Sequence, residues 1–175
     1  MPYSYGKFKQ EVKEKIISCI SAESKILDVG AGSGCYGEML YGKFSKIDAL
    51  EIFPKYIEMF NLHTKYDKVI EGNILQFDFY AYDFLIMGDV LEHLSANDAQ
   101  LLLSKVEDDN KAVLVAVPYL YEQGEEFGNV HETHLQPDLT PEVMAERYPQ
   151  LTLLYGDSNY GYYVNTQFYK GCNQQ

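Results

Sequence analysis

The chain has 175 residues, a formal net charge of −12 and a hydrophobic content of 46%, which is the size and composition of a single globular domain. No apolar run approaches the ~18 residues that a membrane span requires, and the first residues lack the apolar core of a signal peptide. The strongly negative charge disfavours nucleic acid as a partner, because phosphates are bound by clustered Lys and Arg.

Helices and strands alternate in the first half of the chain. Apolar residues recur at helical spacing from Phe8 to Ile20 and predict an N-terminal helix within residues 1–22. After it we expect a strand, a glycine-rich turn, a short helix, a second strand, a helix that begins at a proline, and a third strand. These elements are predicted at residues 25–29, 30–34, 36–44, 46–52, 54–63 and 68–71.

The alternation continues beyond a turn at residues 72–75. The next elements are an apolar strand, a helix capped by Ser95, and a fifth strand that ends at Pro118. Long loops are usually functional or mobile, so the polar residues 118–139 are predicted to form a substrate loop. A helix beginning at Thr140 and a hairpin of two strands complete the chain. The strands of this half are predicted at residues 84–87, 112–117, 151–155 and 162–169.

This order of elements predicts an α/β fold for one domain that spans residues 1–175. Five alternations of strand and helix are typical of a doubly wound, mostly parallel sheet with helices on both faces. The last two strands add an antiparallel C-terminal hairpin, which brings the sheet to seven strands. In such a sheet ligands bind beyond the carboxyl ends of the strands, so we expect the site there.

The three cysteines carry less information about function. Cys19, Cys35 and Cys172 are odd in number and far apart in the sequence, so we expect neither a disulfide framework nor a metal cluster. Free thiols are typical of a reducing compartment, and a cytoplasmic protein is predicted.

The most informative stretch is Asp28-Val29-Gly30-Ala31-Gly32-Ser33-Gly34, directly after the first strand. Its glycines let a ligand lie close to the main chain, and Asp28 is expected at the rim of the turn, where its carboxylate could bind a cationic group. Glu51, at the end of the second strand, is placed as an acid that accepts bonds from a ribose diol. The glycine spacing differs from that of NAD-binding turns, and Asp28 would repel a pyrophosphate, so an NAD enzyme is disfavoured.

These residues, together with Gly72-Asn73-Ile74 and Gly88-Asp89-Val90-Leu91-Glu92-His93-Leu94, resemble the class I S-adenosylmethionine-dependent methyltransferases. The resemblance is to the small-molecule type, similar to the methyltransferases of quinone biosynthesis, and it covers residues 24–117. It implies S-adenosyl-L-methionine as the cofactor. The implied cofactor-binding residues are Asp28, Gly30, Ala31, Gly32, Gly34, Glu51, Ile52, Asn73, Ile74, Gly88 and Asp89.

The resemblance also implies a role for several of these residues. The three glycines would support the methionine part of the cofactor, and Glu51 would hold the ribose hydroxyls. Asn73 and the amide of Ile74 would bind the adenine edge; the family usually has Asp at the position of Asn73, and Asn keeps the acceptor oxygen but loses the charge. The carbonyl of Gly88 would accept from the ammonium group, and Asp89 would border the methyl group.

An acceptor oxygen or protonated nitrogen needs a base. We expect His134 to be this base because it lies in the loop after the fifth strand, and His131, His93 and Asp89 follow as candidates. The alternatives are a polar loop without a catalytic role, a helix-start histidine at His93, and an aspartate at 89 that caps the next turn. The loop sequence His131-Glu132-Thr133-His134 lacks the spacing of a zinc-binding H-E-x-x-H motif, so no metal is predicted.

The function predicted from these residues is transfer of a methyl group from S-adenosylmethionine to a small-molecule acceptor by in-line displacement. The main alternative is a non-catalytic cofactor-binding module, or inactive methyltransferase homologue, that acts through a partner. An aminopropyl transferase would need further acids beside Asp89 in its turn. The acidic charge favours a neutral or cationic acceptor, no nucleic acid or membrane partner is expected, and the oligomeric state stays open.

Overall fold

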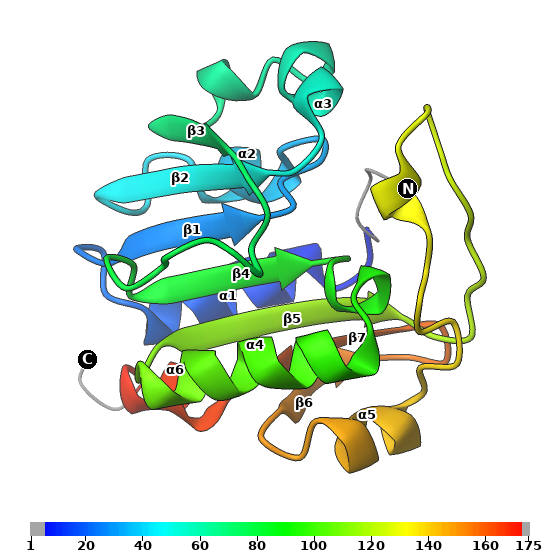
Figure 1. Cartoon of the computed structure of the whole chain (residues 1–175). Helices are drawn as coiled ribbons and strands as arrows, with labels where there is room; N and C mark the ends of the chain where they lie inside the picture. The colour runs from blue at the N-terminus through cyan, green and yellow to red at the C-terminus, as the bar shows by residue number, and fades with distance from the viewer. Residues whose placement is uncertain (1–5, 173–175) are drawn as a thin grey trace.

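A computed structural model describes residues 6–172, which form an α/β fold around one sheet (Figure 1). The sheet has the strand order β3-β2-β1-β4-β5-β7-β6. β7 is antiparallel to both β5 and β6, and the other neighbouring pairs are parallel, so the predicted fold class is confirmed. The strands are β1 (Lys25–Val29), β2 (Lys46–Glu51), β3 (Lys68–Glu71), β4 (Phe84–Gly88), β5 (Ala112–Pro118), β6 (Thr152–Gly156) and β7 (Tyr160–Val164).

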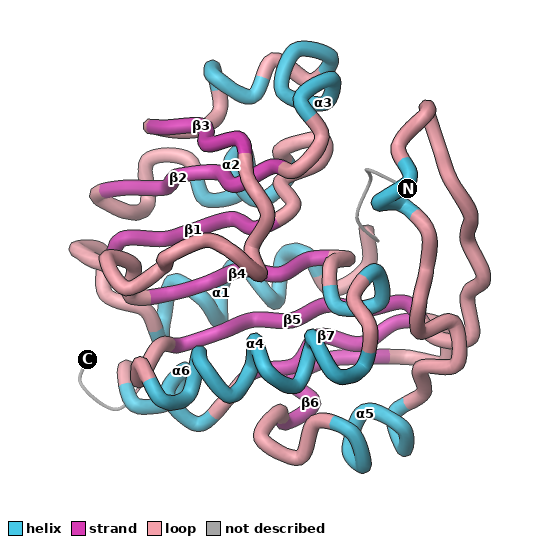
Figure 2. The backbone as a smooth tube through the Cα atoms, in the orientation of Figure 1, coloured by secondary structure: helices cyan, strands magenta, loops and turns pink. Residues whose placement is uncertain are grey.

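Helices pack on both faces of the sheet, and a long irregular segment joins β5 to α5 (Figure 2). No helix within residues 6–172 combines the length and the apolar character that crossing a bilayer needs. The α-helices are α1 (Lys9–Cys19), α2 (Cys35–Leu40), α3 (Pro54–Met59), α4 (Ala96–Asp108), α5 (Pro141–Arg147) and α6 (Thr166–Lys170). The 3₁₀ helices are η1 (Leu62–Thr64), η2 (Leu91–His93) and η3 (Val130–Glu132).

Two hydrophobic cores lie on opposite faces of the sheet. α4 and α5 cover one face, where Leu102, Leu103 and Met144 are buried. α1, α2 and α6 cover the other face, where Ile16 and Phe168 are buried. Because successive side chains of a strand point to opposite faces, each parallel strand contributes to both cores. Central strands buried on both faces explain the continuous apolar runs in the sequence.

The helix starts predicted from the sequence have the expected caps. The Ser95 hydroxyl accepts a hydrogen bond of 3.1 Å from the amide of Asp98 at the start of α4. The Thr140 hydroxyl accepts one of 3.2 Å from the amide of Val143 at the start of α5. Such caps satisfy amide groups that have no partner within the helix.

The first three helices are shorter in the structure than predicted from the sequence. The N-terminal helix prediction begins in residues 1–5, which lie outside the described residues, and α1 itself spans Lys9–Cys19. The helix predicted at 36–44 ends at Leu40, and Gly42 follows in a left-handed conformation with φ of 66°. The helix predicted at 54–63 ends at Met59, because Asn61 has φ of 51° and starts η1.

The strand predicted at 162–169 is wrong in its second half. β7 ends at Val164, and the last residues form α6 instead. The buried side chain of Asn165 causes this change of structure. Its Oδ1 caps α6 through the amide of Phe168 (3.3 Å) and also accepts from the amide of Val113 (3.2 Å), while its Nδ2 donates to the carbonyl of Lys111 (2.9 Å). The side-chain amide of Asn165 therefore caps α6 where β7 ends, and it also connects this junction to β5.

The expectation that all three cysteines are free thiols is also wrong. Cys19 at the end of α1 and Cys172 after α6 form a disulfide, although 153 positions separate them in the sequence. Their spacing gave no signal because the pairing depends on how α1 and α6 pack on the same face of the sheet. The cysteine count therefore no longer argues for a reducing compartment.

We predict that Asn165→Ala lowers the free energy of unfolding by about 2–4 kcal/mol, because it removes a cap and leaves buried backbone groups without partners. The measurement is urea unfolding followed by circular dichroism. Thr140→Ala is the matched control, since it removes a cap alone and costs about 1 kcal/mol. Equal losses in the two variants would contradict the role given to Asn165.

Candidate functional site

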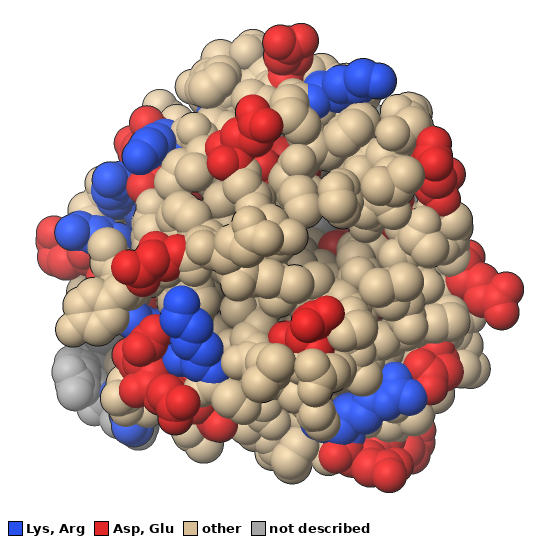
Figure 3. Space-filling view, viewed as in Figure 1, with Lys and Arg blue, Asp and Glu red and all other residues tan. Residues whose placement is uncertain are grey.

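A cavity of about 270 Å³ opens at the carboxyl edge of the parallel strands. Its wall is built from the β1–α2 turn, the ends of β2, β3 and β4, η2, and the long loop after β5. The space-filling view shows this cavity as a central hollow surrounded mostly by uncharged atoms, with red acidic atoms visible inside it (Figure 3). This position is the one expected for the ligand site of an open α/β sheet.

The glycine turn forms the floor of the cavity. Gly30, Ala31 and Gly32 line it, and both glycines are left-handed, with φ of 63° and 50°. A side chain at position 30 would place its Cβ 2.8 Å from a methyl group of Val90, so the close packing of the turn on η2 requires glycine. Gly34 does not line the cavity; it precedes α2 with φ of 78°, and its role is to start that helix.

The carboxylate of Glu51 fixes the shape of this turn. One of its oxygens accepts from the amide of Gly32 and the other from the amide of Phe53, each over 2.9 Å. Glu51 is buried and lines the cavity. Burial raises the pKa of this carboxyl group, while the hydrogen bonds from the two backbone amides lower it. Each oxygen keeps a lone pair, so the group can also accept hydrogen bonds from a diol.

Asp28, like Gly34, is a predicted cofactor residue that does not line the cavity. It is fully buried and does not line the cavity, because the alternation of β1 directs it, like Ile26, toward the core beneath α2. Its carboxylate accepts a short hydrogen bond from the Tyr66 hydroxyl, which itself accepts from the amide of Gly37 over 3.2 Å. Asp28 therefore supports the glycine turn from below.

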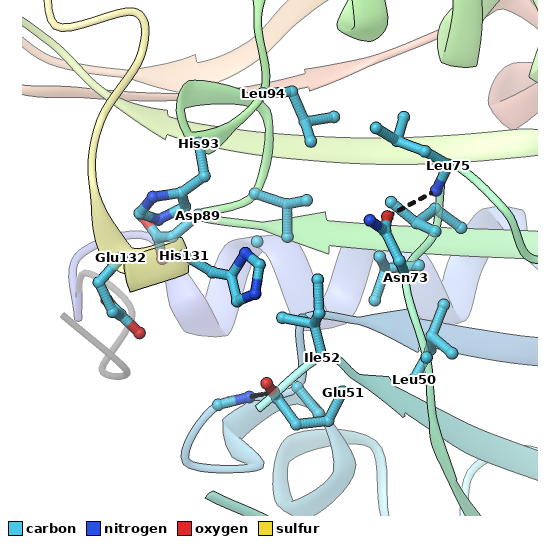
Figure 4. Close-up of a pocket in the computed structure, with 18 of the residues that line it drawn as sticks. Leu50, Glu51, Ile52, Asn73, Leu75, Asp89, His93, Leu94, His131 and Glu132 are labelled. Carbon is cyan, nitrogen blue, oxygen red and sulfur yellow. Dashed lines mark hydrogen bonds between the residues drawn. The ribbon is translucent and has the colours of Figure 1, made fainter. Parts of the chain in front are cut away.

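Asn73 lies across the cavity from His93 and His131 (Figure 4), and Ile74 also lines the cavity. The Oδ1 of Asn73 accepts from the amide of Leu75 over 2.9 Å, which makes a tight turn after β3. The same bond orients the side chain and leaves its amino group as a donor. An amide at this position can thus bind an acceptor nitrogen of a flat ring.

The end of β4 brings Gly88 and Asp89 to the cavity. A Cβ at position 88 would lie 2.3 Å from the ring of Tyr36, so only glycine lets this ring pack against the strand. Asp89 has φ of 58°, a conformation that aspartate tolerates better than most residues. Its Oδ1 accepts a hydrogen bond of 2.6 Å from the Tyr160 hydroxyl. The pKa of Tyr160 is raised mainly by burial and also by the charge of Asp89, so this hydroxyl stays protonated and can donate.

The four candidate catalytic residues do not all reach the cavity. Asp89, His93 and His131 line it, whereas His134 does not. The ring of His134 lies behind that of His93, with the ring centres 4.7 Å apart. Burial lowers the pKa of both imidazoles, that of His93 to about 4. His134 is held there because its amide donates to the carbonyl of Gln123 and its Nδ1 faces the carbonyl of Tyr121.

The long loop is docked on η2, which closes one side of the cavity. The carbonyl of Glu92 accepts from the amides of Leu135 (2.8 Å) and Gln136 (3.1 Å). The side chain of Gln136 donates to the carbonyl of Leu91 over 2.9 Å. These bonds place Asn129, His131 and Glu132 in the cavity wall.

Several wall residues were not predicted from the sequence. They include Tyr36, Tyr56, Asn129 and Glu132. The tyrosines lie on α2 and α3 among apolar residues, where an aromatic side chain is typical of a core. Glu132 was noticed as part of the loop motif, but no sequence pattern shows that it is buried.

Comparison with known proteins supports one kind of ligand. Residues 27–108 match a family described as a methyltransferase domain. The chain matches no curated protein sequence. The matched residues include the glycine turn, Glu51, Asn73 and the η2 segment, which together form most of the cavity wall.

Solved structures share the fold at low sequence identity. An S-adenosylmethionine-dependent methyltransferase from Clostridium acetobutylicum ATCC 824 has a TM-score of 0.66 and 13% identity, over 93% of this chain and 92% of that one. CalS10, an amino pentose methyltransferase from Micromonospora echinaspora, was solved with S-adenosylmethionine bound. It has a TM-score of 0.62 and 12% identity, over 94% of this chain and 92% of CalS10. The mitomycin 7-O-methyltransferase MmcR has a TM-score of 0.58 and 12% identity, over 90% of this chain and 53% of MmcR. This chain therefore spans about half the length of MmcR.

Residues 27–108 match a methyltransferase domain, and the fold is shared with S-adenosylmethionine-dependent methyltransferases, some of them solved with this cofactor bound. The cavity fits this group. A floor of glycine backbone leaves room for an amino-acid chain, a buried carboxylate suits the ribose diol, and the acidic lining suits a ligand with ammonium and sulfonium charges.

We predict that Glu51→Gln weakens binding of S-adenosylhomocysteine at least tenfold, because a neutral amide loses charge-assisted hydrogen bonds to a diol. Isothermal titration calorimetry measures this. Glu71→Gln is the matched control, since Glu71 is exposed and pairs with Glu51 in the register of β2 and β3. Affinity within twofold of wild type for Glu51→Gln would refute the role of this carboxylate.

A second prediction concerns pH. Burial raises the pKa of Asp28 to about 7, with the Tyr66 hydroxyl opposing the rise, whereas an unfolded chain has a value of about 4. The folded state therefore holds a proton that the unfolded state has lost, and stability falls as the pH rises through this window. Asp28→Asn should reduce the loss of unfolding free energy between pH 5 and pH 8 by about 3 kcal/mol.

Urea unfolding at the two pH values measures this difference. Asp108→Asn, which changes an exposed carboxylate at the end of α4, should leave the pH dependence as it is in wild type. An unchanged pH dependence in Asp28→Asn would show that Asp28 ionises normally in the folded protein.

Proposed function

Because residues 27–108 match a methyltransferase domain and the fold is shared with S-adenosylmethionine-dependent methyltransferases, we propose that this chain transfers the methyl group of S-adenosylmethionine to a small-molecule acceptor. The observation that carries the proposal is the division of the cavity wall (Figure 4). The glycine turn, Glu51 and Asn73 form a half suited to the cofactor, and Asp89, His93 and His131 form a second half. The second half offers an acceptor both space and titratable groups.

The cofactor supplies an electrophilic methyl group on a sulfonium, and the reaction is an in-line displacement. The protein then mainly has to hold the acceptor close to the methyl group and aligned with it. Such positioning can lower the activation barrier by about 7 kcal/mol. Asp89 is suited to this task because its left-handed backbone and the Tyr160 hydroxyl fix its carboxylate at the rim of the cavity.

His131 is our choice for the base that removes the acceptor proton. It lies on the cavity wall with its ring among the labelled residues of Figure 4. His134, the first expectation from the sequence, stands behind His93 and has no place on the wall. His93 lines the cavity, but a group whose pKa burial lowers to about 4 takes up a proton poorly at neutral pH.

The charge of the site favours a neutral or cationic acceptor. Four acidic side chains line the cavity: Glu51, Asp89, Asp98 and Glu132. The chain as a whole carries a net charge of −12, so the surrounding field repels anions. Structures that share this fold include an amino pentose methyltransferase and a 1,6-didemethyltoxoflavin methyltransferase, which supports a small-molecule acceptor.

Two measurements test the proposed function. Calorimetry with S-adenosylhomocysteine should give one site per chain, and labelled S-adenosylmethionine should pass its methyl group to at least one member of a panel of neutral and cationic metabolites. Cofactor binding without transfer to any panel member, with or without cell extract, would favour a non-catalytic cofactor-binding module. Absence of binding at millimolar concentration would refute both.

We predict that His131→Ala lowers kcat about 100-fold on an identified acceptor, since general-base catalysis contributes about 10²–10⁴. The KM of the cofactor should change little. His63→Ala is the matched control, because His63 is exposed in η1 and lies outside the cavity wall. Single-turnover kinetics give the measurement, and a kcat for His131→Ala near that of wild type would remove His131 from the reaction.

A further inference from the structure

Three side chains at and behind the cavity wall form a cluster that methyl transfer does not explain. Glu92, His93 and His134 each place one ligand atom within 4.8 Å of the others. Glu92 and His93 belong to η2, and His134 belongs to the long loop. The two histidine rings meet edge to face, with their centres 4.7 Å apart.

Glu92 is the unusual member of the cluster. Its side chain is 1% exposed, and within residues 6–172 neither carboxylate oxygen has a hydrogen-bond partner. A buried carboxylate without partners is costly, so such groups in proteins normally bind a donor or a cation. Glu92 therefore differs from Glu51, whose oxygens both accept amide hydrogen bonds. Both carboxylate oxygens of Glu92 are therefore available to bind a cation.

Both imidazoles are prepared as metal ligands. The Nδ1 of His93 faces the carbonyl of Thr133 over 3.3 Å, and the Nδ1 of His134 faces the carbonyl of Tyr121 over 2.7 Å. A carbonyl oxygen only accepts, so each Nδ1 carries the proton and each Nε2 keeps its lone pair. A carbonyl partner on the second ring nitrogen is the usual arrangement around metal-binding histidines.

The backbone holds the two segments of the cluster together without the side chains. The amides of Leu135 and Gln136, directly after His134, donate to the carbonyl of Glu92. The position of His134 is thus fixed by the residue whose carboxylate it faces. Metal ligands lie about 2 Å from a zinc ion and hence about 3.3 Å from one another in a tetrahedron, so small side-chain rotations would close the cluster.

We propose that Glu92, His93 and His134 bind a divalent first-row transition-metal ion, with Zn²⁺ as the first candidate. Two imidazoles and one carboxylate form a ligand set that suits such ions and leaves coordination positions open. Mg²⁺ and Ca²⁺ prefer oxygen ligands throughout. His93 also lines the cavity, so the ion would stand at the edge of the acceptor half. If the proposed methyl transfer holds, an acceptor hydroxyl can occupy an open position there.

The test uses the chain without a histidine tag, stripped of metal with a chelator. Equilibrium dialysis against Zn²⁺ should give one ion per chain, and Co²⁺ should give visible absorption bands of a site with four or five nitrogen and oxygen ligands. Glu92→Gln and His134→Ala should each weaken binding more than tenfold. The matched control is His131→Ala, which removes an imidazole from the same loop outside the cluster and should keep the ion.

Binding of S-adenosylhomocysteine and circular dichroism are measured on the same samples. Retained S-adenosylhomocysteine binding in Glu92→Gln shows that the variant is folded, and the Co²⁺ spectrum of wild type tests the ligand set even if a variant fails to fold. Absence of saturable Zn²⁺ and Co²⁺ binding, preference for Mg²⁺, or equal binding by Glu92→Gln would overturn the proposal. A chain that binds the ion but not S-adenosylhomocysteine would refute the proposed function and leave the metal site standing.

Discussion

The burial of carboxylates at one edge of the sheet is the constraint on which the site depends. Asp28, Glu51 and Glu92 are buried there in a protein that already carries a net charge of −12. A buried carboxylate must be hydrogen-bonded, protonated or paired with a cation. Asp28 is met by a tyrosine hydroxyl and Glu51 by two backbone amides. Glu92 has no such partner within residues 6–172, so the three acids face the same cost with unequal compensation.

This inequality separates structural acids from ligand-binding acids. The bond between Asp28 and Tyr66 joins β1 to the segment after α3 and reaches α2 through Gly37, so it stabilises the turn without facing a ligand. Glu51 holds the same turn from the cavity side and keeps lone pairs for a diol. A cofactor with ammonium and sulfonium charges reduces the repulsion among these acids, which explains how a strongly acidic cavity can favour its ligand.

The sequence predicted the elements better than it predicted the contacts between them. Apolar runs and capping residues located β1, β3 and β4 to within a residue, because buried strands and helix starts depend on local chemistry. The errors lie where a single side chain acts over a long distance: Asn165 turns a strand into a helix through β5, and Cys19 reaches Cys172. Asp28 lies beneath the glycine turn and not in the cavity wall, and the alternation of β1 already indicates that it faces away from Val29.

The loop after β5 shows most clearly why the candidate site could not be completed from the sequence. Its His131-Glu132-Thr133-His134 stretch has no metal-binding spacing of its own, and the η2 segment contributes only one histidine. The two become one site because the carbonyl of Glu92 accepts two amides of the loop. This clamp sends His131 into the cavity and His134 behind His93. By positioning the loop, the backbone carbonyl of Glu92 places His131 where it could remove a proton from the acceptor and His134 where it could bind the proposed metal ion.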